Sequence, residues 1–348
     1  MKPVLKALSV VALIALFAGL ALLIRRTEPT RRESTFFPMG GIPFKVVAYG
    51  RTQEEFAADM EAVRTRVADL EMRFNRHMPA SELSRINAVI PGEPIEISPD
   101  MKRIVSLSMD WHEMSGGAFE PSITPLIALW KEAGKAGRLP DEGELEKARA
   151  RVGLDKVRIS GDRLRFEGEG MMLDFGAIAK GLMIDEVANL LMRRGVARGV
   201  IDAGGNGLAF GGGRFRFGIQ DPTAERGRLM GAIDVIMGGV VTSGSYERYV
   251  TIGGRRYSHI IDPRTGMPVE NGMIAATVVG GTGAGADALA TTLMILGRNR
   301  GIELIKRLGQ YQALLVTEGA EGPTAWVSTG LAPRLVLTKE WSDRVRLF

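Results

Sequence analysis

The chain contains no cysteine. This absence excludes disulfide bonds, thiolate metal sites, cysteine nucleophiles and lipid attachment through an amino-terminal cysteine. It fits an oxidising or a reducing compartment equally well.

Net charge is also missing from most of the chain, although the whole sequence carries a formal charge of +5. Six basic residues, and Glu28 as the one acid, lie within the first 32 positions. Removing them from the 45 basic and 40 acidic residues leaves a body without net formal charge. The sequence contains no basic stripe, so it does not predict a nucleic-acid partner.

The amino-terminal segment contains an uncharged, apolar run from Ala7 to Ile24, between Lys6 and Arg25. The run approaches the ~20 residues that span a bilayer and exceeds the ~7–15 residues of a typical signal-peptide core. No clear cleavage site precedes the arginines, so we favour an uncleaved membrane anchor over a cleaved signal. The flanking charges do not give its orientation.

The order of helix and strand patterns predicts an α+β fold. Apolar residues from Phe56 to Phe74 recur in steps of four and three, as on one face of a helix. Further helices are expected after Asp100, over 176–194, over 286–296 and over 301–308, and short strands over 157–173, 215–219, 246–252, 256–261, 274–279 and 312–317. We expect residues 1–33 to form the anchor and a linker, and residues 34–348 the folded domain. The stretch from Pro29 to Pro38 is expected to link the apolar segment to the folded domain.

A glycine-rich turn that opens into a helix, Gly280–Thr292, is the most informative segment. Such helix starts suit anions, yet Asp287 in the first turn would repel an unshielded phosphate. A divalent cation resolves the conflict, because Thr291 projects from the same helix face and carboxylate, hydroxyl and carbonyl oxygens suit Mg²⁺. The alternative is that Asp287 only caps its own helix.

A second dense segment, Leu173–Asp185, places Asp174 and Lys180 near another helix start, and Asp202–Asn206 follows that helix. Neither glycine-rich segment matches a Walker A loop or a Rossmann motif. Taken alone, Lys180 could be a solvated helix charge.

His259 is one of only three histidines, and it lies in a β-prone stretch before the turn Asp262–Gly266. A strand end there could point it into a cleft. A structural role is the alternative, since neither a metal-binding histidine pair nor a Ser/His/Asp order accompanies it.

Taken together, eight segments resemble the ApbE flavin-transferase family in order and spacing. They are Met39–Gly41, Phe74–Asn87, Gly116–Ser122, Leu173–Gly181, Asp202–Asn206, Thr242–Arg248, His259–Gly266 and Ala286–Thr291. The resemblance implies a T-fold-like α+β architecture with antiparallel sheets packed against helices.

The resemblance also implies a site. It places Met39, His77, Ala118, Phe119, Glu120, Asp174, Lys180 and Ile260 around FAD, and gives Mg²⁺ the side chains of Asp287 and Thr291 with the carbonyls of Ala177 and Ala284. Three positions differ from the usual family pattern: His77 replaces a common tyrosine, and Glu120 and Asn206 each replace a common aspartate. The replacements retain the ability to stack or to form hydrogen bonds.

The implied reaction is transfer of FMN from FAD to a threonine or serine hydroxyl of an acceptor protein, with release of AMP. Lys180 would add a fixed positive charge, and His259 is the candidate general base. Two alternatives stay open: an FAD pyrophosphatase that releases FMN and AMP, and a tethered flavin-binding module without turnover.

Acceptors of this family resemble D-x-x-[S/G]-[G/A]-A-[S/T], and we find no such segment in this chain. The acceptor is therefore expected to be another protein. The resemblance suggests flavin-binding subunits of membrane redox complexes. With the anchor, this predicts a location at the inner membrane with the catalytic domain on the periplasmic side.

Overall fold

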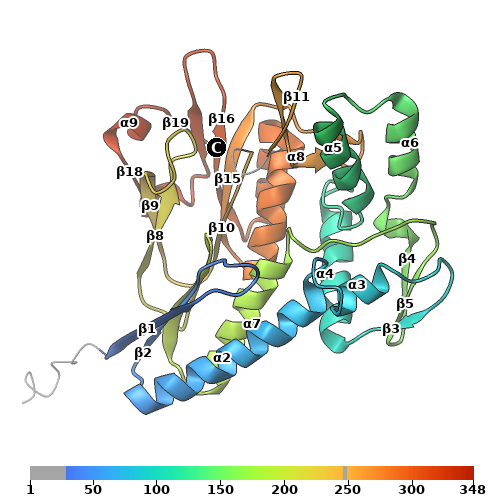
Figure 1. Cartoon of the computed structure of the whole chain (residues 1–348). Helices are drawn as coiled ribbons and strands as arrows, with labels where there is room; N and C mark the ends of the chain where they lie inside the picture. The colour runs from blue at the N-terminus through green and yellow to red at the C-terminus, as the bar shows by residue number, and fades with distance from the viewer. Residues whose placement is uncertain (1–28, 246–248) are drawn as a thin grey trace, which may run out of the picture.

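A long mixed sheet forms the centre of the computed structural model, which describes residues 29–245 and 249–348 (Figure 1). Within these residues nine strands lie side by side in the order β1 (Arg31–Phe36), β2 (Phe44–Tyr49), β6 (Arg198–Ala203), β7 (Asn206–Phe210), β10 (Gly238–Gly244), β15 (Met273–Gly280), β16 (Gln312–Thr317), β17 (Thr324–Val327) and β19 (Val345–Leu347). Neighbours pair antiparallel, except that β17 and β19 are parallel. The predicted α+β class is confirmed.

Helices cover one face of this sheet. Helix α7 (Ala179–Arg193) lies against β6 and β7, and α8 (Gly283–Leu308) lies against β10 and β15 (Figure 1). Outside them pack α2 (Gln53–Phe74), α3 (Glu82–Ile86) and α4 (Pro99–Met114). The predicted apolar face of α2 is confirmed, because Phe56, Met60, Val63, Val67, Leu70 and Phe74 are all buried.

A second, smaller sheet covers part of the opposite face. It consists of β18 (Leu335–Leu337), β9 (Leu229–Val235) and β8 (Phe215–Gln220). Its apolar side chains share a core with residues of β7, β10, β15 and β16, and Trp341 of α9 (Lys339–Ser342) closes that core. The central sheet is therefore buried on both faces over most of its middle strands.

A third cluster, which the sequence patterns did not predict, joins two helices to two hairpins. Helices α5 (Thr124–Ala136) and α6 (Glu142–Ala150) share a small core with β11 (Tyr249–Ile252), β12 (Arg255–Ser258) and β13 (Ile261–Asp262), which pairs with β14 (Met267–Pro268). Trp130 packs against Tyr257 and donates its indole N–H to the Gly266 carbonyl at 2.8 Å. These contacts anchor the segment on either side of His259.

Several predicted boundaries differ from the structure. Strand β1 occupies most of the predicted linker, because its backbone pairs with β2 along its whole length. The predicted strands over 157–173 are β4 (Val157–Ser160) and β5 (Arg163–Phe166), which pair with each other and with β3 (Ile95–Glu96), and the chain after Phe166 leaves the sheet. The two helices predicted over 286–308 form α8 with a break at Gly297, where φ is 76° and ψ is 175°.

The predicted anchor, residues 7–24, lies outside the described residues. Among residues 29–245 and 249–348, none of the helices combines the length and apolar character needed to cross a bilayer.

A buried ion cluster joins α2 to the end of α7 and gives a first prediction. The Asp59 carboxylate, fully buried, accepts hydrogen bonds from Arg51 Nε at 2.8 Å and Arg194 Nε at 2.7 Å. Asp59→Ala leaves both guanidinium groups without this partner and should lower the free energy of unfolding by about 3 kcal/mol. Urea denaturation measures it, with the exposed Glu54→Ala on the same helix as the control. Equal stability of the two variants would contradict this role.

Candidate active site

Lys180 and Asp287 lie where the first turns of α7 and α8 meet, next to the central sheet (Figure 1). Two glycines make the crossing possible. A Cβ atom on Gly181 would lie 2.2 Å from the Gly283 carbonyl oxygen, and one on Gly283 would lie 2.6 Å from the Gly181 carbonyl oxygen. Any side chain at either position would push the two helices apart.

Each helix supplies a carboxylate to the start of the other. Asp287 of α8 is buried, and its Oδ2 accepts the Gly181 N–H of α7 at 3.0 Å. Asp185 of α7 accepts the N–H groups of Gly283 and Ala284 at 2.7 and 2.8 Å. Burial raises the pKa of the Asp185 carboxyl to about 6, and the two amides act in the opposite direction.

At α8 the general preference of helix starts for anions is met by acceptor groups of the protein itself. The Gly283 and Ala284 amides bond to Asp185, the Gly285 amide donates to Thr282 Oγ1 at 3.0 Å, and the Ala286 amide donates to the Thr282 carbonyl. The first-turn donors are therefore occupied within the protein. Asp287 also does not cap its own helix, because its amide partner belongs to α7.

Lys180 and Thr291 lie beside Asp287. Lys180 Nζ is 3.8 Å from Asp287 Oδ1 and donates to the Gly176 carbonyl at 3.5 Å. Thr291, one turn after Asp287, has its hydroxyl 3.3 Å from Ser243 Oγ of β10. Ala177 lies in the turn that precedes α7, and Ala284 lies in the first turn of α8. Lys180 is thus in ion-pair reach of Asp287, and the other three predicted metal ligands lie on α8 or in the turn that leads into α7.

The chemistry of this donor set fits Mg²⁺. One carboxylate, the hydroxyls of Thr291 and Ser243 and nearby backbone carbonyls are hard oxygen ligands, and Mg²⁺ is commonly held by one or two carboxylates while it keeps several waters. Among the described residues, no three His, Cys, Asp or Glu side chains gather into a metal cluster. The donor set is therefore unlike a structural zinc site.

Asp174 lies in the loop before α7, held from three directions. Its carboxylate accepts Arg76 Nε at 2.5 Å and the Gly176 N–H at 2.7 Å, and its own N–H donates to the Pro121 carbonyl. Asn87 exchanges two hydrogen bonds with the Leu173 backbone next to it. Sequence reasoning missed Arg76 as the partner of Asp174, although it adjoins the predicted residue His77.

The turn Ala118–Glu120 adjoins Asp174 through Pro121, but the Glu120 side chain points inward. Its carboxylate accepts from the Ser122 hydroxyl at 2.7 Å and from the Leu154 N–H at 3.1 Å. Ala118 and Phe119 are buried in the main core, the apolar cluster that α2, α4, α7 and α8 form with the sheet face they cover. The Glu120 carboxylate therefore stabilises this turn from within.

The remaining predicted FAD contacts lie on loops. His77 is exposed just after α2, and its N–H donates to Asn75 Oδ1. Met39 is half-buried against the main core, with the positive φ of 52° that is uncommon for a residue other than glycine.

His259 is exposed in a bend between β12 and β13, so the strand predicted over 256–261 is interrupted there. The Ile260 N–H donates to Ser258 Oγ at 3.1 Å, which breaks the ladder, and the Ile260 side chain is buried in the main core.

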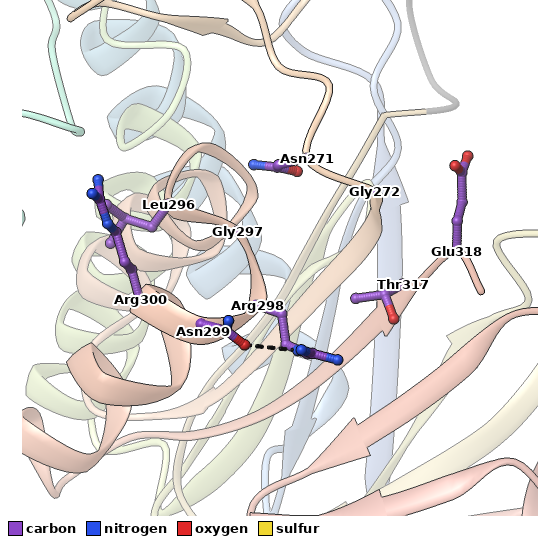
Figure 2. Close-up of a pocket in the computed structure, with 9 residues that line it drawn as sticks. All are labelled: Asn271, Gly272, Leu296, Gly297, Arg298, Asn299, Arg300, Thr317 and Glu318. Atoms are coloured by element: carbon purple, nitrogen blue, oxygen red, sulfur yellow. Dashed lines mark hydrogen bonds between the residues drawn. The ribbon is translucent and has the colours of Figure 1, made fainter. Parts of the chain in front are cut away.

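A separate cleft of about 490 Å³ lies beside the break in α8, roughly 15 Å along the helix from Asp287. Figure 2 shows its lining residues, Asn271, Gly272, Leu296, Gly297, Arg298, Asn299, Arg300, Thr317 and Glu318, all different from the predicted site residues. Asn271 Nδ2 donates to the carbonyls of Met294 and Ile295, which satisfies backbone groups freed at the break. The cleft is thus a consequence of the kink.

The glycine contact between α7 and α8 gives a second prediction. Gly181→Ala should lower the free energy of unfolding by about 1–3 kcal/mol, as overpacking does, because the added methyl group would meet the α8 backbone. Thermal unfolding measures the effect. Gly143→Ala on α6, where the added Cβ would lie 3.4 Å from Asp141 Oδ1, is the control. Wild-type stability in Gly181→Ala would contradict the close contact.

Comparison with known proteins agrees with this geometry. A model of the ApbE family matches residues 40–315. The chain is 29% identical to the FAD:protein FMN transferase of Vibrio cholerae, covering 93% of this chain and 98% of the relative, and 31% identical to one from Klebsiella pneumoniae, covering 71% and 73%. The apo structure of the flavinyl transferase ApbE from Pseudomonas stutzeri is 27% identical, with a TM-score of 0.77 over 89% of this chain and 98% of that one. On this match, which spans most of the sequence, the chain belongs to the ApbE family.

Proposed function

We propose that this protein transfers FMN from FAD to a threonine or serine hydroxyl of an acceptor protein and releases AMP. The observation that carries the proposal is the α7–α8 crossing, where Lys180 Nζ lies 3.8 Å from Asp287 Oδ1 and Thr291 follows Asp287 by one turn on the same face of α8. The relatives named FAD:protein FMN transferase support the same reaction.

In the proposed site, Asp287 and Thr291 hold Mg²⁺ through their side chains, and Ala177 and Ala284 contribute carbonyls. Bound there, Mg²⁺ supplies positive charge against the charge that grows on the pyrophosphate oxygens. Lys180 is placed to act in the same direction, since its ammonium group lies at the start of α7 beside Asp287.

The bond changes are those of a phosphoryl-type transfer. The acceptor hydroxyl oxygen attacks the FMN-side phosphorus, and the bond from that phosphorus to the oxygen bridging to AMP breaks. His259, exposed in the bend after β12, accepts the hydroxyl proton in this proposal. Met39, His77, Ala118, Phe119, Glu120, Asp174 and Ile260 position the FAD. Within this set, Asp174 orients Arg76 and Glu120 keeps the neighbouring turn in place.

The proposed acceptors are flavin-binding subunits of membrane redox complexes, met on the extracytoplasmic face of the inner membrane. A tether through residues 7–24 would hold enzyme and acceptor in one thin layer and so raise their effective concentration. Comparing transfer in intact cells by the full chain and by a chain lacking residues 1–28 tests the tether. Equal transfer by both would count against it.

Release of AMP from FAD tests the reaction class. The wild-type chain should release AMP only with both Mg²⁺ and an acceptor present, in amounts equal to the flavin attached to the acceptor. AMP and free FMN without an acceptor would instead indicate a pyrophosphatase. Bound FAD without AMP would indicate a binding module.

A further inference from the structure

We propose that Asp185 is a positioning residue of this site: its carboxylate holds the first turn of α8 against α7 and thereby fixes Asp287 beside Lys180. The inference rests on the proposed function for the identity of the ligand. The positioning role is argued from hydrogen bonds between residues of this chain.

Asp185 of α7 contacts the first turn of α8 directly. Both oxygens of Asp185 are used, one by the Gly283 N–H and one by the Ala284 N–H. Hydrogen bonds from amides to an ionised carboxylate are short and roughly twice as strong as neutral ones. Thr282 completes the turn from within α8 by accepting the Gly285 N–H. Asp185 is thus the external part of this cap.

The hydrogen bonds that Asp185 and Asp287 accept lie on either side of the contact between Gly181 and Gly283. Asp185 follows Gly181 by one helical turn on α7, and Asp287 follows Gly283 by one turn on α8, so each pair shares a helix face. Asp185 bonds at Gly283, and Asp287 bonds at Gly181. Because the helices touch through backbone at the glycines, loosening the Asp185 bond frees α8 to slide or tilt. The Asp287 carboxylate would move with it.

Ala284 connects Asp185 to a second proposed metal ligand. Its N–H donates to Asp185, and its carbonyl belongs to the proposed metal ligands. Asp185 therefore acts on two proposed ligands: the Ala284 carbonyl, through the residue whose N–H it accepts, and Asp287, through the helix turn that follows. Residues behind metal ligands commonly change metal affinity by about 10–100-fold when they are replaced.

Asparagine is the sharpest replacement, because it keeps the volume of aspartate. Its single carbonyl oxygen can accept one of the two amides, and its NH₂ group would face the other amide donor. Asp185→Asn should therefore loosen one side of the cap without opening a cavity.

Glu186→Gln is the matched control. Glu186 follows Asp185 on α7, is also buried, and is paired with Arg66 at 2.9 Å and with Arg103, away from α8. The change removes the same charge from the same helix. It should cost stability without altering the α8 cap.

The experiment measures Mn²⁺ binding to the full chain with FAD present, from the electron paramagnetic resonance signal of the free ion. We expect Asp185→Asn to weaken Mn²⁺ binding by about tenfold or more, while the KM for FAD stays within about threefold. Amide hydrogen exchange at Gly283 and Ala284 should accelerate in this variant only. Glu186→Gln should bind Mn²⁺ as the wild type does.

If Asp185→Asn does not fold, Thr282→Ala serves in its place, because it loosens the same turn from within α8. It should weaken Mn²⁺ binding in the same direction. Wild-type Mn²⁺ binding in the variant tested, or an equal loss in Glu186→Gln, would overturn the proposal. Failure of the proposed function differs, since the wild-type chain itself would then transfer no FMN.

Discussion

Asp287→Asn should lower FMN transfer by about a hundredfold or more. The change removes the carboxylate charge that the proposal assigns to the metal, and metal-assisted stabilisation of transition-state charge is worth several kcal/mol. The asparagine carbonyl can still accept the Gly181 N–H, so the start of α7 should stay in place. Initial rates at limiting Mg²⁺ measure the effect.

Glu303→Gln is the control for this variant, because Glu303 is exposed on the same helix. It should transfer FMN at the wild-type rate. If Asp287→Asn kept its rate within about threefold of the wild type at limiting Mg²⁺, Asp287 would not be a direct metal ligand. Retained FAD binding in the variant would show that the loss lies in the reaction step.

His259→Ala should lower the rate of transfer by about 10²–10⁴-fold, the usual contribution of a general base. FAD affinity should change little, because the proposed role concerns the acceptor proton. Single-turnover transfer from the FAD-saturated complex, together with FAD titration, separates the two effects.

Measuring FAD affinity and the transfer rate separately distinguishes two roles for His259. If affinity for FAD falls while transfer from the saturated complex does not, His259 is a flavin contact and another group takes the proton. If the rate falls and FAD affinity holds, the loss of rate should also shrink as the pH rises, because hydroxide then replaces the missing base.

Local patterns predicted α2, α4, α7 and the two parts of α8, but not α3, α5, α6 or α9. The apolar face of α2 and the break within α8 follow from residue spacing and from glycine, which act within a few positions of the chain. Lys180, Asp287 and Thr291 were also predicted together, although they come from two helices, because the family resemblance carries their pairing.

The features that the sequence did not predict depend on contacts between segments far apart in the chain. Asp185 and the amides of α8 are about a hundred residues apart, so no spacing rule connects them. The sequence therefore did not show that Asp185 accepts the amides at the start of α8. A helix start offers free amides only until another segment supplies an acceptor. The packing of α5 and α6 against the hairpins near His259 was missed for the same reason.

Flavin fluorescence of a denatured acceptor tests the central claim most directly. The wild-type chain, FAD, Mg²⁺ and an acceptor with the terminal threonine or serine are incubated, separated under denaturing conditions and imaged. Fluorescence should remain on the acceptor, and should vanish when that residue is alanine or when Mg²⁺ is chelated. A non-fluorescent acceptor beside free FMN and AMP, or fluorescence on the enzyme chain itself, would contradict the account.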